Sequence, residues 1–135
     1  MPTAQVNGEK CAHSAHPGGY AAIRRTWHDG DVVNDTIPMA LRLEAMPDNP
    51  DRAAVLYGPL VLAAGVGPLD GPEPQVPVLL TANRDPGAWV EPVEGNPLPF
   101  HTTGVGRPHD VALQPLYHMP GQRHNLYRAF LHARP

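Results

Sequence analysis

The sequence predicts an all-β fold: an antiparallel β-sandwich whose strands are joined by long loops rich in proline and glycine. The 135 residues include 18 Pro and 13 Gly. Because proline fixes φ and lacks a backbone donor, long helices have little room. Residues 31–44 show the two-residue alternation of a strand with one buried face. Short apolar segments elsewhere are separated by turn residues, which is typical of sandwiches and barrels.

The longest alternating segment, residues 31–44, is predicted to be one strand with an apolar odd-numbered face. Pro38 interrupts it, and because proline cannot donate to a neighbouring strand we expect an edge or a bulge there. The core should contain side chains from this strand and from the next apolar segment, whereas two charged side chains between them should face solvent. The predicted buried residues are Leu41, Leu43, Val55, Leu60 and Leu62, and the predicted exposed residues are Arg42 and Glu44.

The first thirty residues contain two turn signals between candidate strands. Residues 3–7 predict a short strand that ends in an Asn-Gly dipeptide at 7–8, which favours a two-residue hairpin turn. Residues 20–27, with an aromatic at each end, suit a half-buried strand. Residues 28–31 predict a turn in which Gly30 can adopt a positive φ.

Residues 50–57 are compatible with two structures. Asn49-Pro50-Asp51 is a suitable helix start, with a cap, a proline at the first helical position and an early acid. The alternative is a turn followed by a strand that continues into residues 60–64, and periodicity cannot separate the two over so short a segment. Further candidate strands are 76–80, 88–93, 98–102, 111–113 and 125–131.

Charge and hydropathy exclude two classes of partner. The net charge is −3 and no basic cluster is present, whereas nucleic-acid binding needs grouped Lys and Arg to displace counterions from phosphates. The longest apolar stretch, residues 59–64, is far too short to cross a bilayer. We therefore expect neither a nucleic-acid partner nor a membrane partner.

Histidine and cysteine offer one candidate metal cluster, formed by Cys11, His13 and His16. Structural zinc sites need four ligands, and no second pair at a suitable spacing follows. Cys11 is the only cysteine, so an intrachain disulfide is excluded. No metal site and no cofactor are therefore predicted.

Acidic residues do not form an obvious catalytic pair. Glycoside hydrolysis needs two carboxylates held on either side of the scissile bond. The 13 acids here, Asp31 and Asp110 among them, lie mostly in turns, where Asp commonly accepts hydrogen bonds from the backbone. Serine-nucleophile and zinc-protease motifs are missing from the sequence. We predict no catalytic residue.

Aromatic side chains are the candidates for carbohydrate contact, since they combine a large apolar face with a polar tip. A sandwich of this size needs most of them in its core, and we expect that position for Tyr20, Trp27 and Tyr57. Trp89 lies in a turn-rich stretch, so it is the predicted surface residue for carbohydrate contact.

A set of residues in the first half of the chain follows the order and spacing of a known family. The matching region, residues 6–64, resembles the C-terminal β-sandwich region after the catalytic barrel of family-127 glycoside hydrolases, which include β-L-arabinofuranosidases. Residues 113–127 match the terminal strands more weakly, and residues 66–110 match nothing in the family. The matching residues are Val6-Asn7-Gly8, Gly19-Tyr20, Ile23, Arg25, Trp27, Gly30-Asp31, Pro38-Met39, Ala54, Leu56 and residues 58–63, then Leu113, Pro115-Leu116-Tyr117 and Tyr127.

This resemblance implies a strand rather than a helix over residues 50–57. It also implies that the catalytic and zinc-binding residues belong to an upstream (α/α)₆ barrel, so that none is carried over to this chain. The predicted organisation is one accessory domain over residues 1–135. Within it, 6–64 are family-like strands, 65–110 are loop-rich with short strands, and 111–135 are closing strands.

Three functions remain open. The first is a non-catalytic module of a bacterial glycoside hydrolase that buttresses the catalytic barrel or a homodimer interface. The second is a carbohydrate-binding module that uses exposed aromatics such as Trp89. The third is a small metal-binding protein built on histidines. A structural module should expose an apolar patch, whereas a binding module should contain a groove with an aromatic wall.

Overall fold

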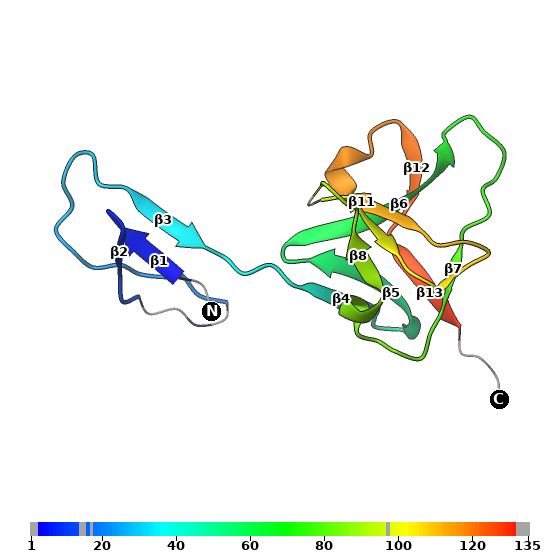
Figure 1. Ribbon diagram of the computed structural model, residues 1–135, viewed down its shortest axis with the longest axis horizontal. Coiled ribbons are helices and arrows are strands. Elements are labelled where there is room, and N and C mark those ends of the chain that lie inside the picture. The colour runs from blue at the N-terminus through cyan, green and yellow to red at the C-terminus, as the bar shows by residue number, and fades with distance from the viewer. Residues whose placement is uncertain (1–2, 14–15, 17, 97, 132–135) are drawn as a thin grey trace. The chain divides into compact units, whose positions relative to one another are not determined.

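A computed structural model describes residues 3–13, 16, 18–96 and 98–131. The chain divides into two compact units, residues 1–38 and 39–135, which differs from the single domain predicted (Figure 1). The reason lies in the segment predicted as one strand over 31–44. Strand β3 (Val33–Thr36) pairs inside the first unit, strand β4 (Leu41–Met46) pairs inside the second, and residues 37–40 between them are in no strand.

Unit 1 is built on a three-stranded antiparallel sheet in the order β2-β1-β3. Its other strands are β1 (Thr3–Val6) and β2 (Glu9–Lys10), joined by the predicted hairpin turn, in which Asn7 and Gly8 both have positive φ. This is the primed geometry that matches strand twist. The predicted turn at 28–31 is also present, with the Asp31 amide donating to the His28 carbonyl at 3.2 Å.

The predicted strand over residues 20–27 is wrong. Only an isolated bridge at Ala22 forms there, and Tyr20 and Trp27 are 95% and 48% exposed. Among the described residues of unit 1, the buried apolar side chains are Ala4 and Val6, both from the central strand. A sheet this small offers little surface against which a further segment can be buried.

Unit 2 is a sandwich-like all-β domain, as predicted, with two 3₁₀ turns. One path of hydrogen-bonded strands runs β10-β7-β13-β5-β6-β11-β9-β8, with β12 pairing with β6 and β4 with β5. The bounds are β5 (Asn49–Tyr57), β6 (Leu60–Pro68), β7 (Val78–Leu80), η1 (Pro86–Ala88), β8 (Val90–Pro92), β9 (Phe100–Thr102), β10 (Gly106–Arg107), β11 (Ala112–Pro115), η2 (Leu116–His118), β12 (Gln122–Asn125) and β13 (Tyr127–Leu131).

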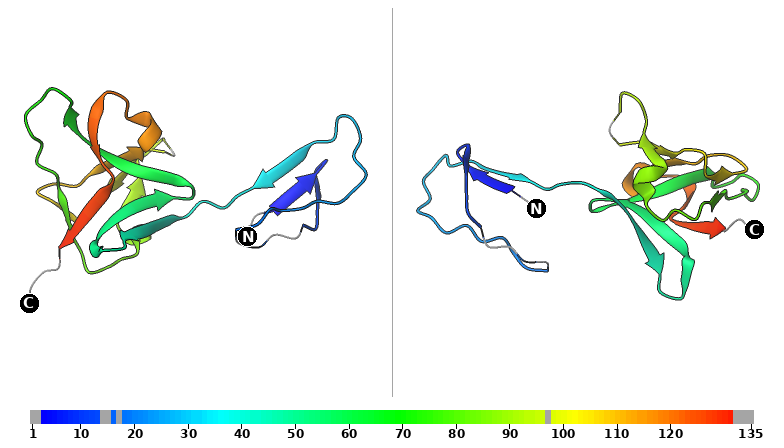
Figure 2. Two further views of the ribbon diagram at one scale, coloured as in Figure 1. Left: turned by 180° about the vertical axis from the view of Figure 1, so that it is seen from behind. Right: turned by 60° about the horizontal axis from the view of Figure 1, so that its bottom comes forward.

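Strands β4, β5 and β6 form a meander and lie side by side in the views of Figures 1 and 2. The strand alternative for residues 50–57 is therefore correct. The turn from β5 to β6 contains Gly58 at φ 55°, and a Cβ there would lie 2.3 Å from the Met39 sulfur. The positive φ is what favours glycine in this turn, because the flexible Met39 side chain could move away from an added Cβ.

One core cluster fills unit 2. Val55 and Leu62 are fully buried, as predicted, whereas Leu41 and Leu43 are half-buried side chains that pack against the cluster. Leu60 is also only half-buried, and Arg42 and Glu44 are exposed as predicted. The cluster consists of Ala53, Val55, Leu62, Ala64, Leu79, Trp89, Val90, Phe100, Val111, Leu113 and Phe130.

One strand pair departs from the predicted antiparallel arrangement. Strand β13 is antiparallel to β5 but parallel to β7, with Phe130 opposite Leu79. The long connection from β7 to β13 makes a parallel pair feasible, because parallel neighbours need a crossover rather than a tight turn. The pairing brings Leu79 and Phe130 into the core together.

Candidate functional site

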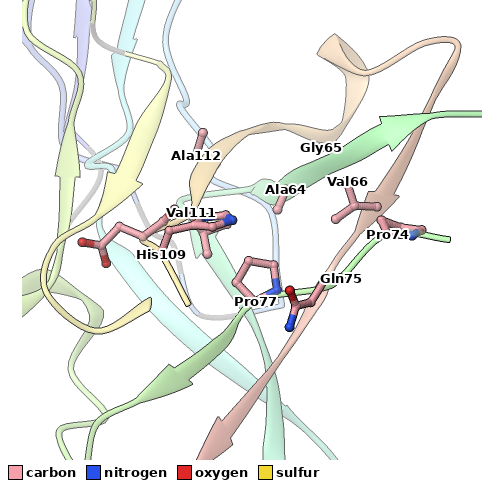
Figure 3. A pocket seen from close by; sticks show the side chains of 10 residues that line it. Ala64, Gly65, Val66, Pro74, Gln75, Pro77, His109, Val111 and Ala112 are labelled. Carbon is pink, nitrogen blue, oxygen red and sulfur yellow. Dashed lines mark hydrogen bonds between the residues drawn. The ribbon is translucent and has the colours of Figure 1, made fainter. Parts of the chain in front are cut away.

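A hollow of about 470 Å³ opens in unit 2 where strands β6 and β11 separate. The two strands pair only at Leu62–Ala63 with Pro115–Gln114, while Ala112 and Leu113 pair with β9 on the other edge of β11. Figure 3 shows Pro77 and Gln75 facing Ala64 and Val66 across this space. The hollow is lined by Ala64, Gly65, Val66, Pro74, Gln75, Pro77, His109, Asp110, Val111 and Ala112.

The chemistry of these walls does not support glycoside hydrolysis. Most lining groups are aliphatic, and the polar side chains come from Gln75, His109 and Asp110. Asp110 is the single carboxylate of the lining, whereas hydrolysis by the usual mechanism needs two carboxyl groups on either side of the bond. The lining also contains no aromatic side chain on which a sugar ring could stack.

Asp110 organises the loop between β9 and β11. One carboxylate oxygen accepts hydrogen bonds from the Thr102 hydroxyl and the Gly106 amide, both at 2.9 Å, and the other accepts from the Gly104 amide at 2.8 Å. The Thr102 hydroxyl in turn accepts from the Val111 amide at 2.8 Å. A Cβ at Gly106 would lie 2.3 Å from the His109 carbonyl oxygen, so the loop closes only around glycine there.

These hydrogen bonds decide the protonation state of Asp110. Burial alone would raise the pKa of its carboxyl, but hydrogen bonds from the Gly106 and Gly104 amides and the Thr102 hydroxyl outweigh it and hold the pKa below its usual value. A carboxylate kept ionised in this way cannot act as a general acid near neutral pH. Asp110 therefore serves the backbone, as predicted for turn acids.

Asp31 has the same function in unit 1. Its carboxylate accepts hydrogen bonds from the Asn7 side-chain amide at 2.8 Å and from the His28 amide at 2.9 Å, and Arg25 lies 3.6 Å away. The hydrogen bond from Asn7, then that from His28, lowers the pKa of Asp31 below its usual value. Asn7 also accepts from the Val32 amide at 2.9 Å, so the two turns of unit 1 are joined through these side chains.

The candidate metal ligands do not converge. Among the residues that the structure describes, which include Cys11, His13 and His16, no three His, Cys, Asp or Glu side chains are placed to hold a metal ion. A ring nitrogen of His13 lies 3.4 Å from the Cys11 carbonyl oxygen, within the same short segment.

The predicted exposure of Trp89 is wrong. Trp89 is only 3% exposed, its indole N–H donates to the Asn83 carbonyl at 3.0 Å, and its ring meets Phe130 edge-on at 5.9 Å. The missed signal is local: Asn83 accepts from the Asp85 amide, and Asp85 accepts from the Gly87 amide and caps η1. These two Asx turns aim the following tryptophan inwards, so it offers no surface for sugar contact.

The predictions for the other aromatic residues are wrong or only partly confirmed. Tyr20 and Trp27, expected in the core, are exposed on unit 1, where the Arg25 guanidinium lies 5.2 Å from the Trp27 ring centre. Tyr57 is half-buried and meets Phe100 at 5.1 Å between ring centres. Aromatic content alone could not assign these positions, because each depends on whether a second layer covers the segment.

Sequence reasoning also missed a buried cation, Arg128. Its side chain is 1% exposed, and one terminal nitrogen donates to the Asn125 carbonyl at 2.7 Å and to the Asn125 side-chain oxygen at 2.5 Å. The other two guanidinium nitrogens are buried without a partner among the described residues. Burial lowers the pKa of Arg128 to about 10.

Comparisons with known proteins match the chain to one family model and to solved structures. Residues 1–39 match the model of the family described as beta-L-arabinofuranosidase, GH127 middle domain. A solved GH127 beta-arabinofuranosidase matches with a TM-score of 0.55 and 20% identity, over 97% of this chain and 23% of that chain. No curated protein matches significantly.

These matches relate the chain to glycoside hydrolase family 127 through its first 39 residues and show that its fold is that of a part of such an enzyme. The predicted placement in the C-terminal region does not receive the same support, because the matching model is that of the middle domain. The chain spans about a quarter of the solved relative. In the described part of the chain, no helix is long and apolar enough to cross a membrane.

Proposed function

We propose that this chain is a non-catalytic portion of a glycoside hydrolase, in which residues 1–38 belong to a middle domain and residues 39–135 form an accessory sandwich. The observation that carries the proposal is the coincidence of two boundaries. The family match ends at residue 39, and the first compact unit ends at Pro38. A sequence match and a division by contacts are independent, so their agreement supports a domain boundary there.

The state of the acids supports the non-catalytic part. The pKa of the carboxyl group is lowered in both Asp31 and Asp110, and in each case the cause includes hydrogen bonds that hold a turn or loop in place. A catalytic acid would instead need a raised pKa and a second carboxyl group across a pocket. The accessory sandwich therefore has a structural role in this proposal. Its strands form a folded layer that buttresses the catalytic barrel of the parent protein.

Two measurements test this proposal. The purified chain should hydrolyse 4-nitrophenyl β-L-arabinofuranoside and other aryl glycosides no faster than buffer. The variants Asp31→Asn and Asp110→Asn should give the same blank rate. Activity that survives repurification and disappears in Asp110→Asn would contradict the proposal, because it would show that the chain contains its own site. The gene around these residues should also encode a helical barrel upstream, and an open reading frame without one would contradict the assignment.

A further inference from the structure

A second hollow lies on the face of unit 2 that points away from its core, and strand register explains it. Glu44 on β4 and Tyr127 on β13 are each the direct partner of Ala54 on β5. Directly opposite residues share a face of a sheet, so Glu44 and Tyr127 flank the small Ala54 side chain. Strands are about 4.8 Å apart, so the two flanking backbones are separated by roughly 10 Å.

The next row of the same sheet closes one end of this space. Leu56 lies two residues beyond Ala54 and is the direct partner of both Arg42 and Val61. Leu126, which precedes β13, contributes a further apolar wall. The resulting trough, named here the Tyr127 trough, has a volume of about 220 Å³ and is lined by Glu44, Ala54, Leu56, Val61, Leu126 and Tyr127.

The side chains of the Tyr127 trough combine an aromatic wall with a charged rim. Tyr127 is 44% exposed, and the Glu44 side chain is 70% exposed. Arg42 is held beside the trough by a hydrogen bond from one terminal nitrogen to the Gly58 carbonyl at 3.3 Å, and its other terminal nitrogen lies 3.8 Å from the Glu44 carboxylate.

We propose that the Tyr127 trough binds one sugar ring of a glycan. An aromatic ring offers a flat apolar face to the C–H groups of a sugar, and an adjacent carboxylate and guanidinium offer an acceptor and donors to its hydroxyls. The small Ala54 floor leaves room between the walls, and one carboxylate allows binding without hydrolysis. The choice of an arabinofuranoside as one probe in the test below rests on the proposed function.

The charged side chains of Glu44 and Arg42 favour a sugar, rather than an apolar protein surface, as the ligand of the trough. A protein face packed on the trough would remove Glu44 and Arg42 from water, and their separation of 3.8 Å is too long for the hydrogen bond that would offset that cost. A polyhydroxylated ligand replaces lost water contacts with its own hydroxyls. The first hollow, between β6 and β11, has no aromatic wall and therefore does not offer a similar site.

The test is an NMR titration of the 135-residue chain with methyl β-L-arabinofuranoside and, separately, methyl β-D-glucopyranoside. At least one of the two should shift the amide signals of Ala54, Leu56 and Tyr127 in a saturable way. The variant Tyr127→Ala should weaken binding about tenfold or more, because it removes the stacking face. Tyr127→Phe keeps that face and should stay within about threefold of the parent affinity.

Tyr117→Ala is the matched control, since Tyr117 is 61% exposed on unit 2 but lies outside the trough. It should leave the affinity unchanged. Three results would overturn the proposal: no saturable shifts with either glycoside, equal affinity in Tyr127→Ala, or self-association of the chain that depends on Tyr127. Any of these would leave the proposed accessory role standing, because that role is tested by hydrolysis and by the parent gene.

Discussion

Units 1 and 2 are both built from short strands and tight turns, but they differ in how much apolar surface each covers by itself. The described residues of unit 1 bury Ala4 and Val6, while five of its large apolar side chains stay exposed. Unit 2 gathers eleven buried apolar side chains into one cluster, drawn from strands far apart in sequence. The exposed side chains in unit 1 are Tyr20, Trp27, Val32, Val33 and Ile37.

The difference shows that strand chemistry and domain stability are separate properties. Alternation and turn dipeptides are enough to form β1, β2 and β3, but a single layer leaves one face of its sheet in water. In unit 2 the crossover that places β13 between β5 and β7 brings Phe130 against Trp89 and closes the core. The predictions below test this contrast, beginning with the largest effect.

The sharpest test removes a similar amount of aliphatic side chain from each unit. Leu62→Ala should lower the free energy of unfolding of unit 2 by about 2–5 kcal/mol, because Leu62 is 1% exposed within the core. Ile37→Ala should change stability by less than about 0.5 kcal/mol, because Ile37 is 63% exposed. Urea unfolding followed by circular dichroism measures both, and equal losses would contradict the contrast between the two units.

The sequence predicted much of unit 2 and less of unit 1. The exposure of Arg42 and Glu44 and the burial of Val55 and Leu62 follow from local alternation, because the β4–β5–β6 meander pairs neighbours in sequence. The break at residues 37–40 was missed, since alternation continues across Pro38 although the two strands belong to different sheets. The chain division therefore depends on pairing partners that periodicity does not specify.

Site prediction failed for two aromatic side chains, and the reasons differ. Trp89 was predicted as a surface residue because the local Asx turns at Asn83 and Asp85 were overlooked, and the crossover of β13 then supplies Phe130 as its partner in the core. The Tyr127 trough was also missed, because it needs the register of β4 and β13 on β5 to bring Glu44 and Tyr127 to either side of Ala54. Turn acids were the opposite case, since the hydrogen bonds of Asp110 are local and its role followed from its position.

Arg128 is a buried residue of unit 2 whose side chain has hydrogen-bond donors without a partner among the described residues. Replacing it with methionine should raise the free energy of unfolding by about 1–4 kcal/mol, because a buried charge with two unpartnered nitrogens is exchanged for an apolar side chain of similar length. Arg52→Met, at an exposed position on the neighbouring strand β5, should change it by less than about 0.5 kcal/mol.

The pH dependence of this effect follows from the lowered pKa of Arg128. Below its folded-state pKa of about 10 the guanidinium is charged in both states, so the cost of burial is fully present. Stability should recover only as pH rises from about 10 towards the higher pKa that the guanidinium has in the unfolded chain. The gain in Arg128→Met should therefore be constant from pH 6 to 9 in urea unfolding, and a destabilised variant would show that the guanidinium is favourable where it lies.

The two tryptophans report the two units separately. Trp89→Phe should destabilise unit 2 by about 1–2 kcal/mol, because it removes the indole donor to Asn83 and part of a buried ring. Trp27→Phe should be close to neutral. In the first variant the remaining Trp27 emission should be red-shifted and readily quenched by acrylamide, whereas Trp89 in the second should be protected. Equal quenching of the two would contradict the difference in burial.

The smallest effects on stability are expected for the two turn carboxylates, Asp110 and Asp31. Their dependence on pH distinguishes them from the effects of substitutions in the core. Hydrogen bonds hold the pKa of the Asp110 carboxyl in the folded state below its usual value, so the stability it contributes is present above about pH 4 and is lost as pH falls through the folded-state pKa. Asp110→Asn should cost about 1 kcal/mol at pH 7, a low figure because solvent screens this largely exposed group. The variant should also lose less stability than the parent chain between pH 4.5 and 2.5.

Asp31→Asn should lower stability over the same pH range as Asp110→Asn, but only in unit 1. Its pKa is lowered chiefly by the hydrogen bond from Asn7, so the substitution should speed amide exchange at His28 and Val32 and leave the core amides of unit 2 unchanged. Hydrogen exchange read by NMR at pH 6 resolves the two units in one experiment. Faster exchange at Val55 or Leu62 in Asp31→Asn would mean that the stabilities of the two units are coupled, and the contrast between them would then fail.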